Sequence, residues 1–470
     1  MRRKLGVLVA MLALVATAGT VHAAGFALIE QSVKGLGHGF AGSAAAAEDA
    51  STVYFNPAGM VLIEGQQVVA AAHLIAPSAE FSTTTAQNAL PASVGGPQPL
   101  SGGDGGDAGQ RGIAPNLYYT YNPGTGWALG LGVNAPFGLS TDYDRTWVGR
   151  YHAVESEVIT VNINPSIAYQ VTDKLSIGAG VSAQYIDATL SSMVDFGLQS
   201  FSSLAAAGQL TQAAQLVSAG VVSNPRADIF SEVTADDWSY GYNLGLLYQF
   251  TENTRVGLAY RSQIKQKLEG DVDFSVMDPD YLQSFGLLGA AQATFADQGA
   301  SGSIDLPASA SLSLFHRYNN QLAVLADVTW TGWSSFDKLV IDFDGTLAGN
   351  PSVTTENWDD TWRFALGTVY NPSPELALRF GLAYDQTVIS SDEYRTPRIP
   401  DADRYWVTVG GGYQLTDVWS VDAAYAHLFV EDSRLDKIDD GTGEDAGRGT
   451  VIGDYENSVD IASVQVTMAF

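Results

Sequence analysis

The sequence predicts an all-β fold, a 14-stranded antiparallel transmembrane β-barrel with an N-terminal hatch (plug) domain. Three observations indicate it. Segments of about ten residues alternate large apolar side chains with small or polar ones, which is typical of a strand with two unlike faces. The connections between these segments alternate between short turns and long loops, as in outer-membrane barrels. Aromatic residues gather at the segment ends beside the short turns, where such barrels carry an interfacial girdle.

The first 23 residues are predicted to be a secretory signal peptide. A basic start at residues 2–4 precedes an apolar run that ends near Ala18, and Ala23 completes a small-residue cleavage pattern. The run is shorter than the ~18 residues that a membrane helix needs, and no other stretch of the sequence approaches that length. If the mature chain enters a membrane, it therefore has to do so as a barrel.

The composition limits the class of protein. The chain has 470 residues, no cysteine and a formal net charge of −28. It therefore has no disulfide or thiolate metal site, and its acidity excludes nucleic acid as a partner, because nucleic-acid binding needs a basic face. Two acidic stretches, SGGDGGDAG from Ser101 and DDGTGEDAG from Asp439, offer carboxylates to calcium but lack the EF-hand spacing, so solvated loops are expected. No cofactor and no metal are predicted.

Residues 24–65 do not alternate, and we expect this block to be the hatch. It contains GLGHGFAGSAAAAEDASTVYFNPAGM, from Gly35 to Met60. Its G-x-G-x-x-G match is not a dinucleotide-binding turn, because no βαβ pattern surrounds it. Ser43 is the expected N-cap of one or two helical turns. A barrel of 14 strands leaves an aqueous channel unless a segment fills it; the alternative is a periplasmic tail outside the barrel.

Residues 66–470 are predicted to form the barrel and its long extracellular loops. Each strand reaches the ~9 to 11 residues that a tilted strand needs to cross a bilayer. In 374–385, Leu378 and Phe380 would face lipid and Arg379 the lumen, because a charge on the lipid face costs up to ~2 to 4 kcal/mol at the midplane. The predicted strands lie near 67–76, 113–122, 127–136, 158–171, 174–187, 239–250, 254–265, 308–318, 321–331, 361–371, 374–385, 405–415, 418–429 and 459–470.

The connections support the barrel over a soluble fold. Six short turns, among them NPGTG at Asn122 and TD at Thr416, alternate with seven long connections such as 77–112 and 188–238. A soluble β-sandwich also has aromatic residues at its strand ends, but it should not alternate its loop lengths. The even strand count places both ends of the barrel on the short-turn side.

The sequence resembles the FadL-type long-chain fatty acid transporters of the Gram-negative outer membrane, a group that includes uptake channels for monoaromatic hydrocarbons. The N-terminal block resembles the family's start, and later blocks match in order along nearly the whole mature chain, although the long loops depart most. The later blocks are APFGLSTDY (135–143), WVGRYHA (147–153), INPSIAYQVTDKLSIGAG (163–180), WTGWSSFDKL (330–339), WDDTWRFALG (358–367) and RIPDADRYWVTVGGGY (398–413).

The resemblance implies a route through a barrel closed by a hatch. Ligand would be caught among the extracellular loops, would move to a tighter pocket near the hatch N-terminus, where Phe26 would lie, and would leave sideways after the hatch rearranges. The hatch residues implied in this way are Gly35, Gly37, Asn56, Pro57 and Ala58.

The lateral exit implied by the resemblance is a gap made by a kinked strand near the third position. The best match to the kink is the stretch that holds Asn134, Pro136 and Gly138. Pro136 cannot donate to a β-ladder, which supports a kink, but an ordinary proline at a strand end fits equally well.

Two loops carry apolar, helix-like patterns that would suit ligand capture. The candidates are Phe201 and Leu204 in one loop and Leu282, Phe285 and Leu288 in the other. The alternative is that each helix packs on its neighbouring loop. A carboxylate headgroup would favour a cation. The candidates are Arg150, Arg379, Arg404 and Lys338, with Arg150 foremost, although most of these cations should form lumenal or rim ion pairs.

We therefore expect an uptake channel for hydrophobic small molecules, foremost long-chain fatty acids, that works by facilitated diffusion. Toluene-like monoaromatic hydrocarbons are the alternative substrates. A hydrolase or a general porin is the alternative function, although the scattered histidines fit no hydrolase motif and no enzyme is expected. The expected partners are the hydrophobic ligand, outer-membrane lipid and lipopolysaccharide, with the protein as a monomer. An additional adhesin or phage-receptor role of the loops stays open.

Overall fold

The computed structural model describes residues 25–470, so the predicted signal peptide lies outside the described part of the chain. The described chain forms a closed antiparallel barrel, in which β1 pairs with both β2 and β20. Six barrel strands are each split into two segments (β3/β4, β8/β9, β10/β11, β12/β13, β14/β15 and β18/β19), so 20 segments make 14 strands. The predicted 14-stranded antiparallel β-barrel is confirmed.

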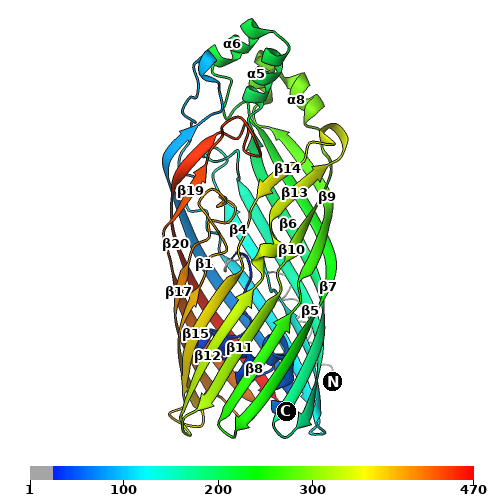
Figure 1. Cartoon of the computed structure of the whole chain (residues 1–470), viewed down its shortest axis with the longest axis vertical. Helices are drawn as coiled ribbons and strands as arrows, with labels where there is room; N and C mark the ends of the chain where they lie inside the picture. The colour runs from blue at the N-terminus through cyan, green and yellow to red at the C-terminus, as the bar shows by residue number, and fades with distance from the viewer. Residues whose placement is uncertain (1–24) are drawn as a thin grey trace.

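The strand segments are β1 (Gly65–Gln87), β2 (Gly112–Asn122), β3 (Trp127–Asn134), β4 (Gly138–Asp142), β5 (Glu155–Thr172), β6 (Leu175–Val194), β7 (Ile229–Thr251), β8 (Thr254–Arg261), β9 (Ile264–Val276), β10 (Gln298–Leu306), β11 (Ser309–Arg317), β12 (Leu322–Thr331), β13 (Lys338–Phe343), β14 (Ser352–Thr355), β15 (Thr361–Tyr370), β16 (Leu376–Asp385), β17 (Arg404–Gln414), β18 (Trp419–Val430), β19 (Ser433–Lys437) and β20 (Thr450–Ala469). Figure 1 shows the short turns and the C-terminus at one end of the barrel and the helices of the long loops at the other.

Several strands are longer than the sequence predicts. β1 runs to Gln87 instead of ending near residue 76, and its ladder with β20 continues up to the pair Gln87↔Thr450. The extension is missed because its outward side chains, such as Glu80, are polar and exposed rather than lipid-facing. The wall therefore continues beyond the apolar zone, and parts of the predicted loops are strand.

The two faces of the wall differ as predicted. On β16, Leu378, Phe380 and Leu382 are exposed on the outer face, while the side chain of Arg379 is buried inside. Among residues 25–470, no helix combines the length and the apolar character that a bilayer crossing requires.

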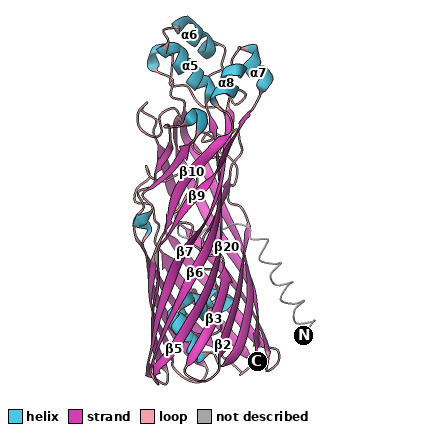
Figure 2. Ribbon diagram, turned by 90° about the vertical axis from the view of Figure 1, so that its right-hand side faces the viewer, coloured by secondary structure: helices cyan, strands magenta, loops and turns pink. Residues whose placement is uncertain are grey.

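The N-terminal segment, residues 25–64, lies inside the barrel. Its helical turns are α2 (Val33–Gly37), α3 (Ser43–Ala46), α4 (Thr52–Phe55) and η2 (Pro57–Leu62). α2 contacts β16–β18, α3 contacts β8 and β11, and η2 contacts β5–β7. Figure 2 shows these turns enclosed by the strands at the short-turn end. The predicted cap is wrong: Gly42, with φ of 68°, is the N-cap of α3, and the Ser43 hydroxyl donates to the Phe40 carbonyl instead.

The long loops carry the remaining helices at the extracellular end. They are α5 (Phe196–Ala206), α6 (Leu210–Ser218), α7 (Pro279–Ser284) and α8 (Leu288–Thr294), with the short turns η3 (Ala92–Val94), η4 (Trp333–Ser335) and η5 (Gly345–Leu347). α5, α6 and α8 stand at the top of the barrel in Figure 1.

Candidate functional site

Glycines of the barrel wall admit the backbone of the N-terminal segment. A Cβ atom added to Gly381 would lie 2.1 Å from the carbonyl carbon of His38, and one added to Gly257 would lie 1.9 Å from the carbonyl oxygen of Ala44. Both contacts are with backbone, which cannot move aside as a flexible side chain can. The wall and the segment are therefore fitted to each other at main-chain distance.

Within the segment, Gly37 is equally confined. A Cβ there would lie 3.1 Å from the Cα of Gly410 in β17, and Gly35 is confined by the ring of Phe40. These contacts explain why the N-terminal block is rich in glycine.

Arginines of the wall hold the carbonyl groups of the segment. Arg255 donates to the Ala46 carbonyl at 2.8 Å, and Arg363 donates to the Gly39 carbonyl at 2.9 Å. Arg261 likewise donates to the carbonyl of residue 54 at 3.0 Å. Main-chain carbonyls near helical turns thus receive charged donors, which make stronger hydrogen bonds than neutral ones.

Asn56 joins the segment to the wall. Its side-chain amide donates to the Ala44 carbonyl at 2.6 Å and to the Leu246 carbonyl of β7 at 3.1 Å, and its side-chain oxygen accepts from the Ala58 N–H at 3.0 Å. Pro57 begins η2 beside it. The Asn-Pro-Ala element is therefore a buried turn that is bonded to β7.

One ion pair connects the segment to the wall. Arg379 of β16 lies 3.6 Å from Glu48 of the segment and 2.9 Å from Asp422 of β18, while Lys34 lies 3.6 Å from Asp49 within the segment. Arg379 is thus committed to two carboxylates.

The third barrel strand is interrupted at the predicted kink. β3 ends at Asn134 and β4 begins at Gly138, and the ladder between β2 and β3 extends only to the pair Leu117↔Val133. The start of the N-terminal segment pairs with the interruption: Leu28 donates to the Pro136 carbonyl at 2.8 Å, and Gly138 donates to the carbonyl of residue 26 at 2.9 Å. The first described residues and the interruption are therefore one hydrogen-bonded unit.

Side chains secure this unit. Gln31 donates to the Ala135 carbonyl at 2.8 Å and accepts from the Asn134 amide at 2.8 Å. The amide of Asn162 in β5 donates in turn to Asn134 at 3.0 Å. Movement of the segment near Gln31 would release several groups of the interruption at once.

Phe26 lies in an aromatic cluster. The centroid of its ring is 4.9 Å from that of Trp333, 5.8 Å from Trp358, 5.9 Å from Phe137 and 6.0 Å from Phe336. Such separations favour edge-to-face contacts. The N-terminal segment therefore begins in an apolar site that is built from three distant parts of the chain.

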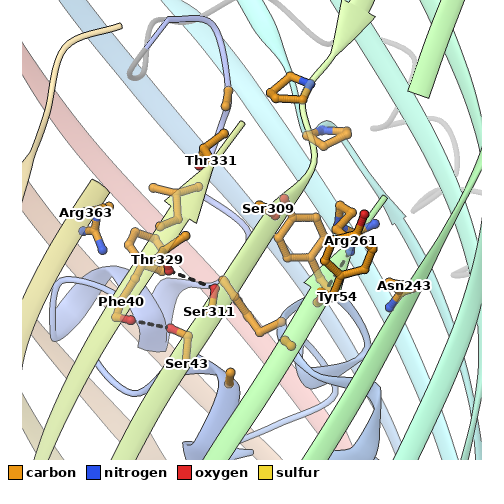
Figure 3. Close-up of a pocket in the computed structure, with 18 of the residues that line it drawn as sticks. Phe40, Ser43, Tyr54, Asn243, Arg261, Ser309, Ser311, Thr329, Thr331 and Arg363 are labelled. Carbon is orange, nitrogen blue, oxygen red and sulfur yellow. Dashed lines mark hydrogen bonds between the residues drawn. The ribbon is translucent and has the colours of Figure 1, made fainter. Parts of the chain in front are cut away.

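A central cavity lies beside the segment. It has about 1090 Å³ of space between atoms, part of it open to solvent. Figure 3 shows Phe40 and Ser43 of the segment facing Arg261, Ser309 and Arg363 of the wall around it. The remaining lining is mixed and includes Tyr54, Phe55, Pro136, Phe137, Asn243, Asp327, Trp333 and Asp385.

Two smaller cavities lie side by side in the extracellular half. The apolar slot, with about 370 Å³ of space between atoms, part of it open to solvent, is lined almost entirely by hydrocarbon. Its larger side chains are Leu190, Val233, Leu268, Ile304, Leu339 and Ile341. The arginine pocket, with about 310 Å³ of space between atoms, part of it open to solvent, is lined by Tyr151, His152, Ser192, Ser352, Thr354, Arg398 and Arg448. Leu339 and Ile341 of β13 line both cavities, so an apolar and a cationic compartment share a border.

At this border Arg398 forms no ion pair with a carboxylate of the described chain, whereas Arg448 lies 3.7 Å from Asp445. The guanidinium of Arg398 donates to the Ser156 hydroxyl at 2.9 Å and to the carbonyls of residues 155 and 191 at 3.1 and 3.2 Å. No carboxylate of the described chain lies within 4.0 Å of it. Burial and the nearby charge of Arg448 lower the pKa of Arg398 to about 10. Such a group is ready to accept an anion.

The carboxyl group of Glu356 interacts electrostatically with Arg398 of this pocket. Burial raises the pKa of Glu356 to about 7, although the charges of Lys437 and Arg398 oppose the rise. It is thus only partly charged near neutral pH. Arg398 and Arg448 were not among the sequence candidates; Arg398 begins the block RIPDADRYW, but its partners come from other loops.

Arg150, the predicted headgroup partner, has no donor left for a ligand. Its guanidinium is fully buried and lies 2.7 Å from Asp228. It also donates to the Tyr151 hydroxyl and to the carbonyls of residues 101, 147 and 223. These bonds use all five N–H groups of an arginine. Arg150 therefore joins loops and does not face a cavity.

The predicted apolar residues of the loop helices lie in two clusters away from Phe26. Phe201 and Leu204 pack with Leu90, Leu198 and Ala213. Leu282, Phe285 and Leu288 pack in the other cluster with Phe196 and Phe295. Leu282 is fully buried and Phe201 nearly so. Packing on neighbouring loops thus occupies much of their surface.

The acidic loop from residue 439 binds its own backbone. The Asp439 carboxylate accepts from the N–H groups of Gly441, Gly447 and Gly449 at 2.7 to 3.0 Å. In the described part of the chain no group of three or more side chains is arranged to hold a metal ion.

Comparisons with known proteins agree with this architecture. The family model described as outer membrane protein transport protein (OMPP1/FadL/TodX) matches residues 13–470. Outer membrane protein P1 of Haemophilus influenzae is 33% identical in an alignment of 428 positions that covers 88% of each chain. A long-chain fatty acid transport protein of Escherichia coli is 28% identical over 86% of this chain and 87% of that protein. The crystal structure of a Pseudomonas aeruginosa FadL homologue, 27% identical, superposes with a TM-score of 0.80 over 95% of this chain and all of the other.

Proposed function

Because the chain belongs to the outer-membrane transport protein family of OMPP1, FadL and TodX, we propose that it takes up long-chain fatty acids across the outer membrane. The observation that carries this proposal is the border between the apolar slot and the arginine pocket. An alkyl chain in the slot would place a carboxylate beside Arg398 and Arg448. Each buried methylene contributes ~0.8 kcal/mol, so a series of such sites offsets the cost of carrying the chain through water.

The route proposed for the ligand runs from the loops to the border site and then to Phe26. Ligand that disturbs the aromatic cluster would shift the start of the N-terminal segment, and with it the interruption between β3 and β4. We propose that residues 24–65 are the hatch, with Gly35, Gly37 and the Asn56–Ala58 turn as the parts that keep it seated. Ligand would then leave laterally near Asn134, Pro136 and Gly138, without an energy source, from a monomeric channel.

Monoaromatic hydrocarbons are the second candidate substrates. The cluster of Phe26, Phe137, Trp333, Phe336 and Trp358 supports them, because aromatic rings pack well edge to face. A toluene-like ligand would need no cation, so the contribution of Arg398 separates the two substrate classes.

Binding measurements on the purified protein in mild detergent test the proposal. We expect oleate to bind and to compete with bound native lipid, and Arg398→Gln with Arg448→Gln to weaken oleate binding about tenfold or more, because a hydrogen bond to a charged group contributes ~1.5 to 3 kcal/mol. Arg226→Gln is the control, since Arg226 pairs with Asp278 on an exposed loop.

Other outcomes identify the alternatives. Toluene binding that is unchanged in the double variant, with no oleate binding, would favour the aromatic substrates. Ester hydrolysis by the purified protein would favour a hydrolase, and high ion conductance of the intact protein in planar bilayers would favour a general porin.

A further inference from the structure

We propose that the central cavity has a second mouth through the barrel wall, at the edge between β7 and the β8–β9 strand. An acyl chain would pass there between the cavity and the outer leaflet. This inference rests on the proposed function and adds a route on a different part of the wall from the β3–β4 interruption. We call the edge the β7 seam; it comprises residues 237–242 of β7 and 262–268 of the facing strand.

The backbone ladder is broken along the seam. β7 pairs with β9 as far as Asp236↔Glu269, and its pairing with β8 begins at Asn243↔Arg261. Within the described chain, no register pair joins the strands between these two points. On its other edge β7 pairs continuously with β6. Of the two edges of β7, only the one facing β8 and β9 is therefore broken.

One main-chain bond and several side-chain bonds close much of the seam in place of the ladder. Ser262 donates its main-chain N–H to the Tyr242 carbonyl at 2.9 Å, and its hydroxyl accepts from the Tyr242 N–H at 2.9 Å. The Ser239 hydroxyl donates to the Lys265 carbonyl at 2.7 Å. The carboxylate of Asp237 accepts from the Lys267 N–H at 2.8 Å. Parting the seam would therefore break a few separate bonds instead of a continuous ladder.

The next edge of the wall is interrupted at the same level. β8 pairs with β11 up to Arg261↔Ser309, and β9 pairs with β10 from Ile264↔Leu306. The residues between, including Pro307, form no register pair in this part of the described chain. Proline has no N–H to donate, so it suits a break in a ladder.

The central cavity reaches this break. Asn243, Arg261 and Ser309 line it from the lumen, as Figure 3 shows. Leu244 and Tyr260 line it too, although they belong to the outer face, where they are 47% and 36% exposed. A cavity in contact with residues of both faces extends into the thickness of the wall at this level.

Aromatic side chains frame the same place from outside. Trp238, Tyr240 and Tyr242 are exposed along β7, and the rings of Tyr242 and Tyr260 are 6.1 Å apart. Exposed tyrosine and tryptophan mark the level of the membrane interface. The break therefore faces the polar boundary of the outer leaflet, where a fatty acid would place its headgroup.

Cysteine cross-linking tests the second mouth, since the chain has no cysteine of its own. A Cβ built at Gly241 would lie 3.0 Å from the Ser262 hydroxyl and 2.7 Å from Cγ1 of Ile264, so Gly241→Cys with Ser262→Cys is within disulfide reach once the Ile264 side chain shifts. Leu246→Cys with Leu258→Cys, a register pair of β7 and β8, is the matched control. The readout is transfer of a fluorescent long-chain fatty acid from the protein to the lipid of proteoliposomes, with binding measured separately.

We expect the oxidised seam pair to retain fatty acid binding and to transfer ligand severalfold more slowly, with recovery after reduction and no change in the oxidised control pair. Transfer by the oxidised seam pair at the rate of its reduced form would overturn the second mouth. Failure of the unmodified protein to bind or transfer the fatty acid would instead overturn the proposed function. If the seam pair does not fold, Ser262→Ala offers the opposite test, because loss of a closing bond should speed transfer; an unchanged or slower rate would count against the seam.

Discussion

The two halves of the barrel interior use arginine differently. In the half near the short turns, Arg255 and Arg363 donate to main-chain carbonyls of the N-terminal segment, so their charge holds one part of the protein to another. In the extracellular half, Arg398 lies at the edge of a cavity beside Arg448, with neutral acceptors only within bonding distance in the described chain. The first arrangement closes the barrel, and the second leaves charge for a ligand.

The space around these arginines differs in the same way. Near the short turns, wall glycines bring the segment into main-chain contact, with no room for a side chain at those positions. In the extracellular half the inner wall carries Leu268, Ile304 and Leu339, where a water-filled barrel would carry polar side chains. The arginines near the short turns thus bind the main chain of the segment, although Nε of Arg255 and Nε and Nη1 of Arg363 are buried without a hydrogen-bond partner. In the extracellular half, buried charge lies beside hydrocarbon, which indicates a binding site.

Arg150→Ala should have the largest effect on stability. It would distinguish structural arginines from ligand-binding arginines within the extracellular half. Removing Arg150 leaves the carboxylate of Asp228 buried without its cation, and the loss of one partner of a buried pair costs ~3 to 5 kcal/mol. We expect the loops to unfold at a much lower temperature. The measurement is the temperature at which the extracellular loops become susceptible to protease. A matched Arg145→Ala change should have a smaller effect, because Arg145 is exposed and has no buried carboxylate partner in the described chain; its guanidinium lies over the ring of Phe230.

Oleate affinity of the folded fraction is the second readout for this variant. It should stay close to that of the unmodified protein, since Arg150 does not line the slot or the arginine pocket. A stable Arg150→Ala protein that no longer binds oleate would mean that Arg150 binds the ligand and is not a structural residue.

Gly381→Ala tests the closed half. The added methyl group would meet the main chain of His38 and Gly39, and overpacking of this kind costs ~1 to 3 kcal/mol. If the N-terminal segment closes the barrel, its displacement should raise ion conductance in planar bilayers.

Gly411→Ala is the control for that change. A Cβ at Gly411 would find its nearest atom at 3.8 Å, which is ordinary contact. Equal conductance of the two variants would show that main-chain contact at Gly381 does not keep the segment seated.

The sequence predicts the barrel strands better than the ligand-binding residues, for physical reasons. Lipid requires apolar side chains at alternate positions, so the membrane zone of β16 is visible in the sequence. Beyond that zone the ladder continues with polar outer faces, as at Glu80 in β1, and periodicity no longer marks the strand. Arg150 is a cation in a matching block, but three of its five acceptors, in residues 101, 223 and 228, come from loops that only the fold brings together.

The border between the apolar slot and the arginine pocket is even harder to predict from the sequence. Arg398 and Arg448 lie in different loops, while Leu339 and Ile341 come from β13. No local pattern links these positions. Phe26, in contrast, is indicated by the resemblance of the N-terminal block, and the aromatic cluster around it supplies the physical reason why an aromatic residue stands there.

The smallest expected effect is a pH dependence of fatty acid affinity in the extracellular half. Glu356, whose pKa burial raises to about 7, loses its negative charge as the pH falls through that value. The arginine pocket then becomes more positive while the carboxylate of a bound fatty acid, with a pKa near that of glutamate in water (~4.3), stays charged. Oleate should therefore bind more tightly below pH 7 than above it, in a titration across that range at constant ionic strength.

Glu356→Gln should remove this dependence and hold the affinity at its low-pH level throughout. Toluene, which has no charge, should bind equally on both sides of the transition. The opposite slope for oleate, or the same slope in Glu356→Gln, would mean that the carboxylate of the ligand does not lie beside Arg398, and the difference between the two halves would then not rest on an unpaired arginine.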